Sequence, residues 1–175
     1  MRWCFGEMVL TNIKRILRHL LVTVWRVNHA FPSITLLAVD RAIKTSEMEH
    51  LGEIRFAVEG ALDGKPLFKG QSARERAIDV FSQLRMWDTE YNNGVLIYLL
   101  LADRAVEIVA DRGIHLKVDS QEWQKICHEM EMAFKQANYE AGVVSGIKAV
   151  IQHLEIHFPA VSGDQSELPD KPAVL

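Results

Sequence analysis

The sequence is poor in cysteine and has no apolar run long enough to cross a membrane. Cys4 and Cys127 are its 2 cysteines, and they lack the Cys-x-x-Cys spacing of a zinc site or a disulfide framework. The most apolar stretch near the N-terminus, residues 20–27, contains Arg26 and is far shorter than the ~20 residues of a spanning helix. It is also not followed by the small-residue cleavage site of a secretory signal. We therefore predict a cytoplasmic protein.

The sequence also lacks a strong excess of one charge. Its formal net charge is -3, which gives no general argument for nucleic-acid binding, so we expect no nucleic-acid partner. No phosphate-binding loop of the Gly-x4-Gly-Lys-Ser kind occurs, and we expect no organic cofactor. With 175 residues, 49% of them hydrophobic and 25% charged, the chain has the composition of a globular domain with one core.

Residues 1–30 predict a basic amphipathic helix. Isoleucine, leucine and valine recur at helical spacing from Ile13 to Val24, and Glu7 is the single acid of this segment. Two interpretations are open: the helix lies on an anionic membrane surface, or it packs its apolar stripe on the domain with its charges in water. The basic residues are Arg2, Lys14, Arg15, Arg18 and Arg26.

The remaining hydrophobic pattern predicts an α/β fold. Residues 53–59 alternate as a strand with one covered face, whereas 95–101 are apolar throughout, as in a strand buried on both faces. Residues 105–110 follow closely enough to form its antiparallel hairpin partner. Ser72 and Glu75 have capping-box spacing, and Asn138 stands as a helix N-cap. Helices are predicted over about 33–50 and 73–87, and from residues 120 and 139 onward.

The chain divides into three predicted parts. Residues 1–31 form the N-terminal helix, and residues 32–158 form the α/β domain. Residues 159–175 contain prolines and acids but little apolar periodicity, which predicts a disordered tail.

Oxygen-bearing side chains flank the buried strand at both ends. Asp88, Glu90 and Asn92 precede it, and Asp103 and Asp111 stand at the two ends of its hairpin partner. Carboxylate and amide oxygens are the ligands that calcium and magnesium bind, and open α/β sheets place sites at strand ends. The alternative is that aspartate and asparagine occur here because they favour turns and strand junctions.

Several short motifs follow one another at characteristic spacing. They are Gly52-Glu53-Ile54-Arg55, Asn93-Gly94-Val95-Leu96, Asp103-Arg104-x-Val106-x-Ile108, Gly113-Ile114, Ala133-Phe134 and Tyr139-Glu140-Ala141-Gly142. In this order, over roughly residues 33–154, they resemble the TPM domain family, which includes thylakoid-lumen acid phosphatase-like proteins and many bacterial proteins of unassigned role. The resemblance implies a three-layer α/β/α sandwich around a small mixed sheet. It also implies a divalent-metal site, with calcium in some members, and a phosphatase activity attributed to some relatives.

The resemblance places candidate metal ligands in the same loops. Asn93 matches the family's asparagine before glycine, and Asp103 matches its aspartate at the hairpin. Asn92 stands where an acid is common, and Asp88 lies in a loop that often supplies an oxygen ligand. The family's Gly-x-Gly-Leu-Glu stretch is changed at two positions, a glycine and the acid, and reads Asp111-Arg112-Gly113-Ile114-His115 here. The metal ligands predicted in this way are Asp88, Asn92, Asn93, Asp103 and Asp111.

A phosphatase needs positive charge for the phosphoryl group and an acid for the leaving group. Asp103, Arg104 and His115 are therefore the candidate catalytic residues. The alternatives are a surface ion pair for the arginine and a structural role for the histidine.

These observations support two hypotheses about function. The first is a calcium- or magnesium-binding, phosphatase-like TPM domain with weak phosphomonoester hydrolase activity. The second is a non-catalytic interaction module held at the inner membrane face by residues 1–30, as accessory to an unidentified protein or membrane complex. Family members commonly carry a signal peptide and a membrane span, and the basic helix would take the place of these anchors.

Overall fold

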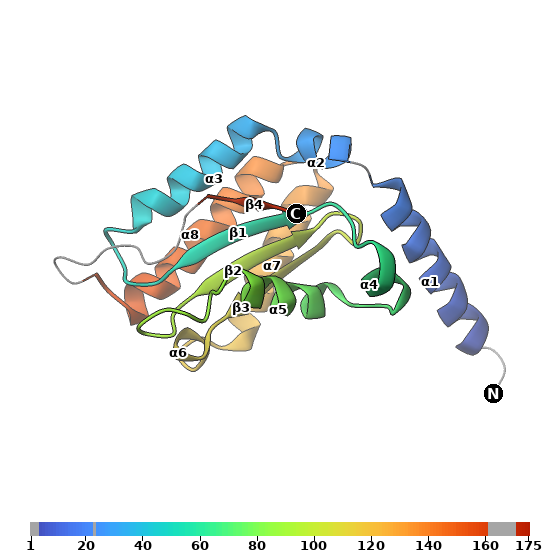
Figure 1. Cartoon of the computed structure of the whole chain (residues 1–175). Helices are drawn as coiled ribbons and strands as arrows, with labels where there is room; N and C mark the ends of the chain where they lie inside the picture. Colours follow the sequence, from blue (N-terminus) through green and yellow to red (C-terminus); the bar gives the residue numbers. More distant parts are fainter. Residues whose placement is uncertain (1–3, 23, 161–170) are drawn as a thin grey trace.

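The fold is built around a four-stranded mixed sheet (Figure 1). The computed structural model describes residues 4–22, 24–160 and 171–175, and it describes side chains from residue 13 onward except 24 and 25. The strands lie in the order β3-β2-β1-β4, with β1 parallel to both of its neighbours and β2 antiparallel to β3. They are β1 (Ile54–Glu59), β2 (Val95–Leu100), β3 (Ala105–Ala110) and β4 (Ala173–Val174).

Helices cover both faces of this sheet. α3, α7 and α8 bury one face against the alternate side chains of the strands, including Phe56 and Ile97. α5 covers the other face, which presents Ala57, Leu96 and Tyr98. This arrangement confirms the predicted three-layer α/β/α sandwich. The helices are α1 (Cys4–Leu21), α2 (Val24–Ala30), α3 (Ser33–Ser46), α4 (Gly64–Phe68), α5 (Ala73–Gln83), α6 (Arg112–His115), α7 (Ser120–Lys135) and α8 (Tyr139–His157).

The predicted hairpin is confirmed. All residues of β2 are buried because helices pack on both of its faces, which explains a run without polar alternation. Its partner β3 pairs antiparallel from Val95↔Ala110 to Leu100↔Ala105. The turn between them begins at Leu101, whose carbonyl oxygen accepts a hydrogen bond from the Arg104 N–H at 3.1 Å.

Local signals predicted helix starts better than connecting segments. The capping box at Ser72 and Glu75 is present and begins α5. Asn138 is the N-cap residue of α8, as predicted, but its side chain makes no capping hydrogen bond. The connection between β1 and α5, for which no helix is predicted from the sequence, contains α4, and Pro66 is tolerated there because a proline in the first turn of a helix loses no intrahelical hydrogen bond.

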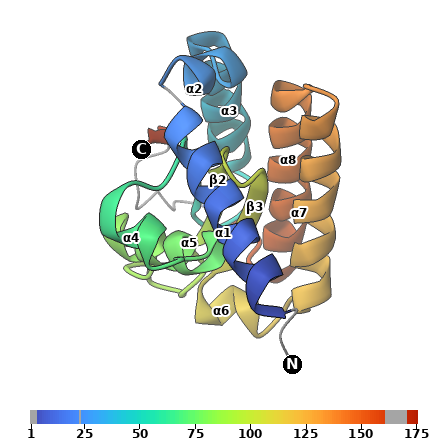
Figure 2. The same cartoon turned by 90° about the vertical axis from the view of Figure 1, so that its right-hand side faces the viewer.

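The two ends of the chain differ from the sequence expectations. The expected N-terminal helix is divided into α1 and α2, and α1 crosses the end of the sheet at which β1 and β2 finish (Figure 2). Residues 161–170 lie outside the described part of the chain, and their predicted disorder stays a prediction. Ala173 and Val174, included in the predicted tail, instead pair with β1 as an edge strand. No described helix has both the length and the apolar character needed to span a membrane.

Candidate functional site

The predicted site residues fall at opposite ends of the β2–β3 hairpin. Asn93 and Asp111 lie where β2 begins and β3 finishes, because Val95 pairs with Ala110. Asp103 lies in the turn at the other end, where Leu100 pairs with Ala105. The five predicted metal ligands therefore do not form one site, because six paired residues of each strand separate the two groups.

Backbone hydrogen bonds join the two segments that carry Asn92, Asn93 and Asp111. The Asp111 N–H donates to the Gly94 carbonyl oxygen at 2.8 Å, and the Gly113 N–H donates to the Asn92 carbonyl oxygen at 2.8 Å. A side chain at Gly113 would collide with this backbone, since an added Cβ would lie 2.6 Å from the Asn92 oxygen. The close approach of the two segments thus depends on glycine.

Two buried oxygens in this group have no hydrogen-bond partner. Asn93 is fully buried, and its Nδ2 donates to the Leu51 carbonyl oxygen at 2.9 Å while its Oδ1 accepts nothing. Asp111 caps α6 through Oδ1, which accepts from the Arg112 N–H at 2.7 Å, and its buried Oδ2 also lacks a partner. Buried oxygens of this kind are rare in folded proteins and each costs roughly 1–3 kcal/mol.

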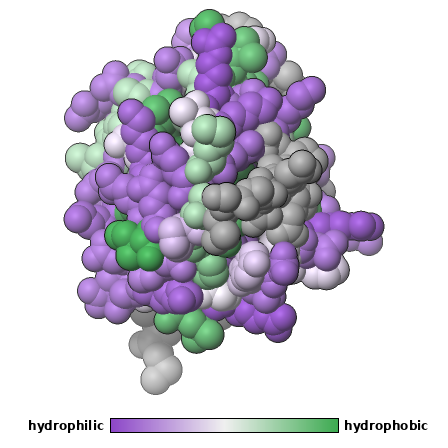
Figure 3. Space-filling model, turned by 90° about the vertical axis from the view of Figure 1, so that its left-hand side faces the viewer, coloured by the Kyte–Doolittle hydropathy of each residue, from purple (hydrophilic) through white to green (hydrophobic). Residues whose placement is uncertain are grey.

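Arg112 adds a positive charge to the same group. Its Nε donates to Asn92 Oδ1 at 2.8 Å, so the Asn92 side chain already has a partner. Asn92 itself adopts a left-handed backbone with φ of 52°, which asparagine tolerates better than most residues. The end of the molecule seen in Figure 3 is largely hydrophilic.

The other predicted residues of this end lie at its margin. Asp88 is exposed, and its N–H donates to the Arg85 carbonyl oxygen at 3.0 Å. His115 is exposed on α6 and lines a separate cavity between β3 and α7. Among the residues whose placement is described, no three His, Cys, Asp or Glu side chains gather closely enough to hold a metal by themselves.

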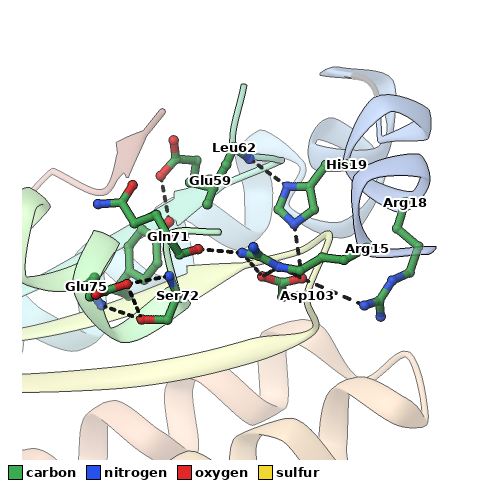
Figure 4. Close-up of polar contacts among 10 residues, drawn as sticks. Arg15, Arg18, His19, Glu59, Leu62, Gln71, Ser72, Glu75 and Asp103 are labelled. Carbon is green, nitrogen blue, oxygen red and sulfur yellow. Dashed lines mark hydrogen bonds and ion pairs between the residues drawn. The ribbon is translucent and has the colours of Figure 1, made fainter. Parts of the chain in front are cut away.

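Asp103, at the opposite end, is bound by α1. Arg15 Nη2 lies 2.8 Å from Asp103 Oδ2, and His19 Nε2 lies 3.0 Å from Asp103 Oδ1 (Figure 4). The fully buried His19 ring also accepts at Nδ1 from the Leu62 N–H, 2.9 Å away. Arg15 Nη2 donates further to the Gln71 carbonyl oxygen at 2.7 Å. Burial opposes the charged carboxylate, but the contacts with Arg15 and His19 outweigh it and lower the pKa of Asp103.

α1 therefore docks mainly through polar side chains, with Ile16 packed against the core on the α5 side of the sheet, and it turns other apolar side chains to solvent. Arg15 and His19 face the sheet end, while Ile13, Leu17 and Leu20 are 48%, 53% and 65% exposed. The interpretation in which the apolar stripe packs on the domain holds for Ile16 but not for Ile13, Leu17, Leu20 and Leu21. The reason for this orientation of α1 is Asp103, whose partly buried carboxylate requires cationic partners. Helical periodicity located the stripe but could not tell which face contacts the domain.

The three candidate catalytic residues do not converge. Asp103 and Arg104 lie in the turn that precedes β3, and His115 lies beyond the far end of that strand. Arg104 is exposed and belongs to a different cavity from His115. The geometry thus shows no arrangement in which the three act on one substrate.

Sequence reasoning missed a buried polar network beside this end of the sheet. The Tyr98 hydroxyl donates to Glu59 Oε2 at 2.6 Å, and Arg76 Nε donates to the same oxygen at 2.8 Å. Burial and the hydrogen bond to Glu59 raise the pKa of Tyr98, which stays protonated. The only sequence signal was a tyrosine within an otherwise aliphatic strand, which does not identify its partner.

A small mixed sheet between two helical layers, with polar clusters at the strand ends, defines the class of fold. The TPM domain matches residues 29–153, and this chain belongs to the TPM domain family. The predicted family membership is thereby confirmed.

Solved structures of similar proteins agree with this assignment. The NMR structure of the BA42 protein from the psychrophilic bacterium Bizionia argentinensis has a TM-score of 0.71 at 32% identity, covering 81% of this chain and 93% of that one. The N-terminal domain of a P. gingivalis protein has a TM-score of 0.53 at 20% identity, covering 67% of this chain and 72% of that one, which concerns the fold alone. No curated protein matches the chain.

Proposed function

We propose that this TPM domain binds a divalent cation, calcium or magnesium, at the end of the hairpin that carries Asn93 and Asp111. The observation that supports this most directly is the pair of buried side-chain oxygens without hydrogen-bond partners. Both residues belong to backbone segments joined by the hydrogen bond from Asp111 to Gly94. A cation bound there would satisfy oxygens that otherwise remain desolvated without compensation.

The donor set fits a weak oxygen-ligand site. Asp111 would supply a carboxylate oxygen and Asn93 an amide oxygen, while backbone carbonyls and water would complete the coordination. The exposed Asp88 adds negative charge to the neighbouring loop. Arg112 opposes cation binding by its charge and engages Asn92. Because few anionic ligands are available, we expect dissociation constants of roughly 0.1–1 mM.

Thermal unfolding with and without the ions tests this proposal. At calcium about ten times above its dissociation constant, binding to the folded state alone should add ~1.4 kcal/mol and raise the melting temperature by roughly 3–6 °C. Asp111→Asn should abolish most of this shift. Asp63→Asn is the matched control, because Asp63 is exposed and makes no side-chain capping hydrogen bond at α4.

Two results of these melting experiments would contradict the proposed cation site. A wild-type melting temperature unchanged by about 10 mM calcium or magnesium would rule out the site. Equal shifts in Asp111→Asn and wild type would place the ion elsewhere. Hydrolysis of p-nitrophenyl phosphate, measured in the same samples, reports separately whether phosphomonoesterase activity accompanies binding.

A second candidate function, attachment at a membrane surface, rests on α1. Its apolar stripe of Ile13, Leu17, Leu20 and Leu21 is exposed, with Leu21 at 71%. The exposed Lys14 and Arg18 neighbour this stripe, as in helices that lie in an anionic lipid interface. We propose that α1 holds the domain peripherally on such a surface, where it would act as an accessory to a membrane complex.

Vesicle flotation tests this second function. The wild-type protein should float with vesicles of phosphatidylglycerol and phosphatidylcholine. Leu17→Asp should weaken the partition by about tenfold, because it replaces an apolar side chain that would be buried in the lipid with a charged one. Leu116→Asp is the control, since Leu116 is 85% exposed and lies outside α1. Equal partition of the wild-type, Leu17→Asp and Leu116→Asp proteins would exclude α1 as the attachment surface.

A further inference from the structure

A second cavity lies at the carboxyl end of β2, away from the Asn93–Asp111 cluster. Its volume is about 520 Å³, and it is bounded by α2, the β2–β3 turn and the junction of α7 with α8. Leu99 of β2 and Leu101, with which the following turn begins, also line it. Open α/β sheets commonly bind ligands beyond the carboxyl ends of their strands.

Cationic side chains from three separate elements line this cavity. Arg26 comes from α2, Arg104 from the hairpin turn and Lys135 from the last turn of α7. All three are exposed, and none forms an ion pair with an acid among the described residues. The acid of the cavity, Glu131, accepts a hydrogen bond from the Val106 N–H at 3.1 Å. The cavity thus carries an excess of positive charge.

The lining also has an apolar and aromatic part. Phe134 and Tyr139 stack with ring centroids 5.4 Å apart and an interplanar angle of 25°. Leu99, which also lines the cavity, is 1% exposed. A ligand that enters this cavity therefore meets an apolar wall and a set of cations together.

The backbone at Arg104 supplies an independent observation. Its φ is 54°, in the left-handed region that glycine and asparagine normally occupy at such turns. An arginine held in this conformation costs free energy that glycine would avoid. Strained residues of this kind concentrate at functional sites, where the side chain is needed.

We propose that this cavity binds a small organic anion, with its phosphate or carboxylate group among Arg26, Arg104 and Lys135 and its apolar part against Phe134 and Tyr139. Guanidinium groups bind both kinds of oxyanion in bidentate fashion. The aromatic pair selects for a ligand body larger than a free inorganic ion. This assignment does not depend on the proposed cation site, because the two lie at opposite ends of the hairpin.

Calorimetric titration with defined probes tests the proposal. The probe is 1-naphthylphosphonate, whose carbon–phosphorus bond resists hydrolysis, and 1-naphthoate carries the alternative oxyanion. Inorganic phosphate lacks the apolar part, and 1-naphthol lacks the charge. We expect at least one of the naphthyl anions to bind and the latter two compounds to bind at least about tenfold more weakly.

A matched pair of variants isolates the cavity. Arg104→Gly suits the left-handed turn and removes one cation, so it should weaken binding by about tenfold or more without loss of folding. Arg85→Gly is the control, because Arg85 is also exposed with φ of 54° but does not line the cavity. Asp111→Asn should leave binding of the naphthyl anion unchanged, which separates this site from the cation site.

Three results would overturn the proposal. They are no binding of either naphthyl anion at millimolar concentration, equal effects of Arg104→Gly and Arg85→Gly, and binding of inorganic phosphate as tight as that of the naphthyl anions. Vesicles of phosphatidylcholine with phosphatidic acid form a further arm of the experiment. Binding to these vesicles that Arg104→Gly abolishes and Leu17→Asp leaves unchanged, without binding of the soluble anions, would assign the cations to a lipid headgroup and equally overturn it.

Discussion

Ala137 adopts a backbone conformation that a glycine would tolerate with less strain. Its φ is 60°, directly after the C-cap of α7, where helices often end with a left-handed glycine. Its N–H donates to the Phe134 carbonyl oxygen at 3.0 Å, so the conformation is fixed by the end of the helix. An alanine here carries strain that a glycine would relieve.

We predict that Ala137→Gly stabilises the protein. Relief of the left-handed strain, reduced by the greater entropy of glycine in the unfolded chain, should add roughly 0.5–1 kcal/mol and raise the melting temperature by about 1–4 °C. Ala133→Gly, within α7, should have the opposite sign and cost about 1 kcal/mol. Destabilisation by both substitutions in a thermal melt would show that Ala137 is not strained.

At the residue scale, the sequence predicted where polar residues lie along the hairpin better than which side chains they contact. Asn93 and Asp111 were predicted to be metal ligands, which stays a prediction, and the hairpin brings their backbone segments together. Asp103 was assigned to the same site, yet it is bound by Arg15 and His19, which are more than 80 positions away in the sequence. Nothing local in a sequence specifies a contact of that separation, because it depends on how a remote helix is placed.

Among the secondary-structure elements, α1 shows how a single carboxylate sets the orientation of a helix. Asp103 accepts from Arg15 and lies 3.0 Å from His19, and Arg18 Nη2 lies 3.9 Å away at a more exposed position. These contacts fix which face of α1 meets the domain. The exposed stripe of Leu17 and its neighbours is a consequence of this polar docking.

We predict that Asp103→Asn loosens α1 while leaving the sheet intact. Loss of the charge-assisted hydrogen bonds, worth about 1.5–3 kcal/mol, should raise amide hydrogen exchange in residues 13–22 by about tenfold or more. Exchange in β1 and β2 should change little. Asp88→Asn, an exposed aspartate at the opposite end, is the control. Unchanged exchange in α1 of the Asp103→Asn protein would contradict the docking role.

The same contact gives α1 docking a dependence on pH. The pKa of Asp103 is lowered in the folded protein, so its stabilising contribution is complete above the unfolded pKa of about 3.9. It is lost as the pH falls through the lower folded value. Docking of α1 should therefore persist at neutral and mildly acidic pH, and weaken only in stronger acid.

For the whole molecule, periodicity and local turns were sufficient to predict the architecture. The unbroken apolar run of β2 required two covered faces, and the four-residue connection from β2 to β3 suited an antiparallel pair. These constraints act over a few residues and are written directly in the sequence. The family resemblance then supplied the mixed sheet, which is confirmed by the parallel pairing of β1 with β2.

The features that could not be predicted arise from contacts between distant segments. The cationic cavity joins α2, the hairpin turn and the end of α7, and no motif marks its members as neighbours. The network of Glu59, Tyr98 and Arg76 likewise forms only after α5 has packed on the sheet. Such sites follow from tertiary packing, and sequence patterns of one element do not contain them.

The position of β4 has a consequence for the order in which the sheet assembles. β2 and β3 are neighbours in the chain, but Ala57 pairs with Ala173, which is 173 − 57 = 116 positions away. Closing a loop of that length costs more chain entropy than closing a hairpin, and long-range pairs form late in folding. The hairpin should therefore nucleate the sheet, and β1 should keep an open edge until β4 docks. During that interval the β1 edge is the part of the nascent molecule most exposed to pairing with another chain.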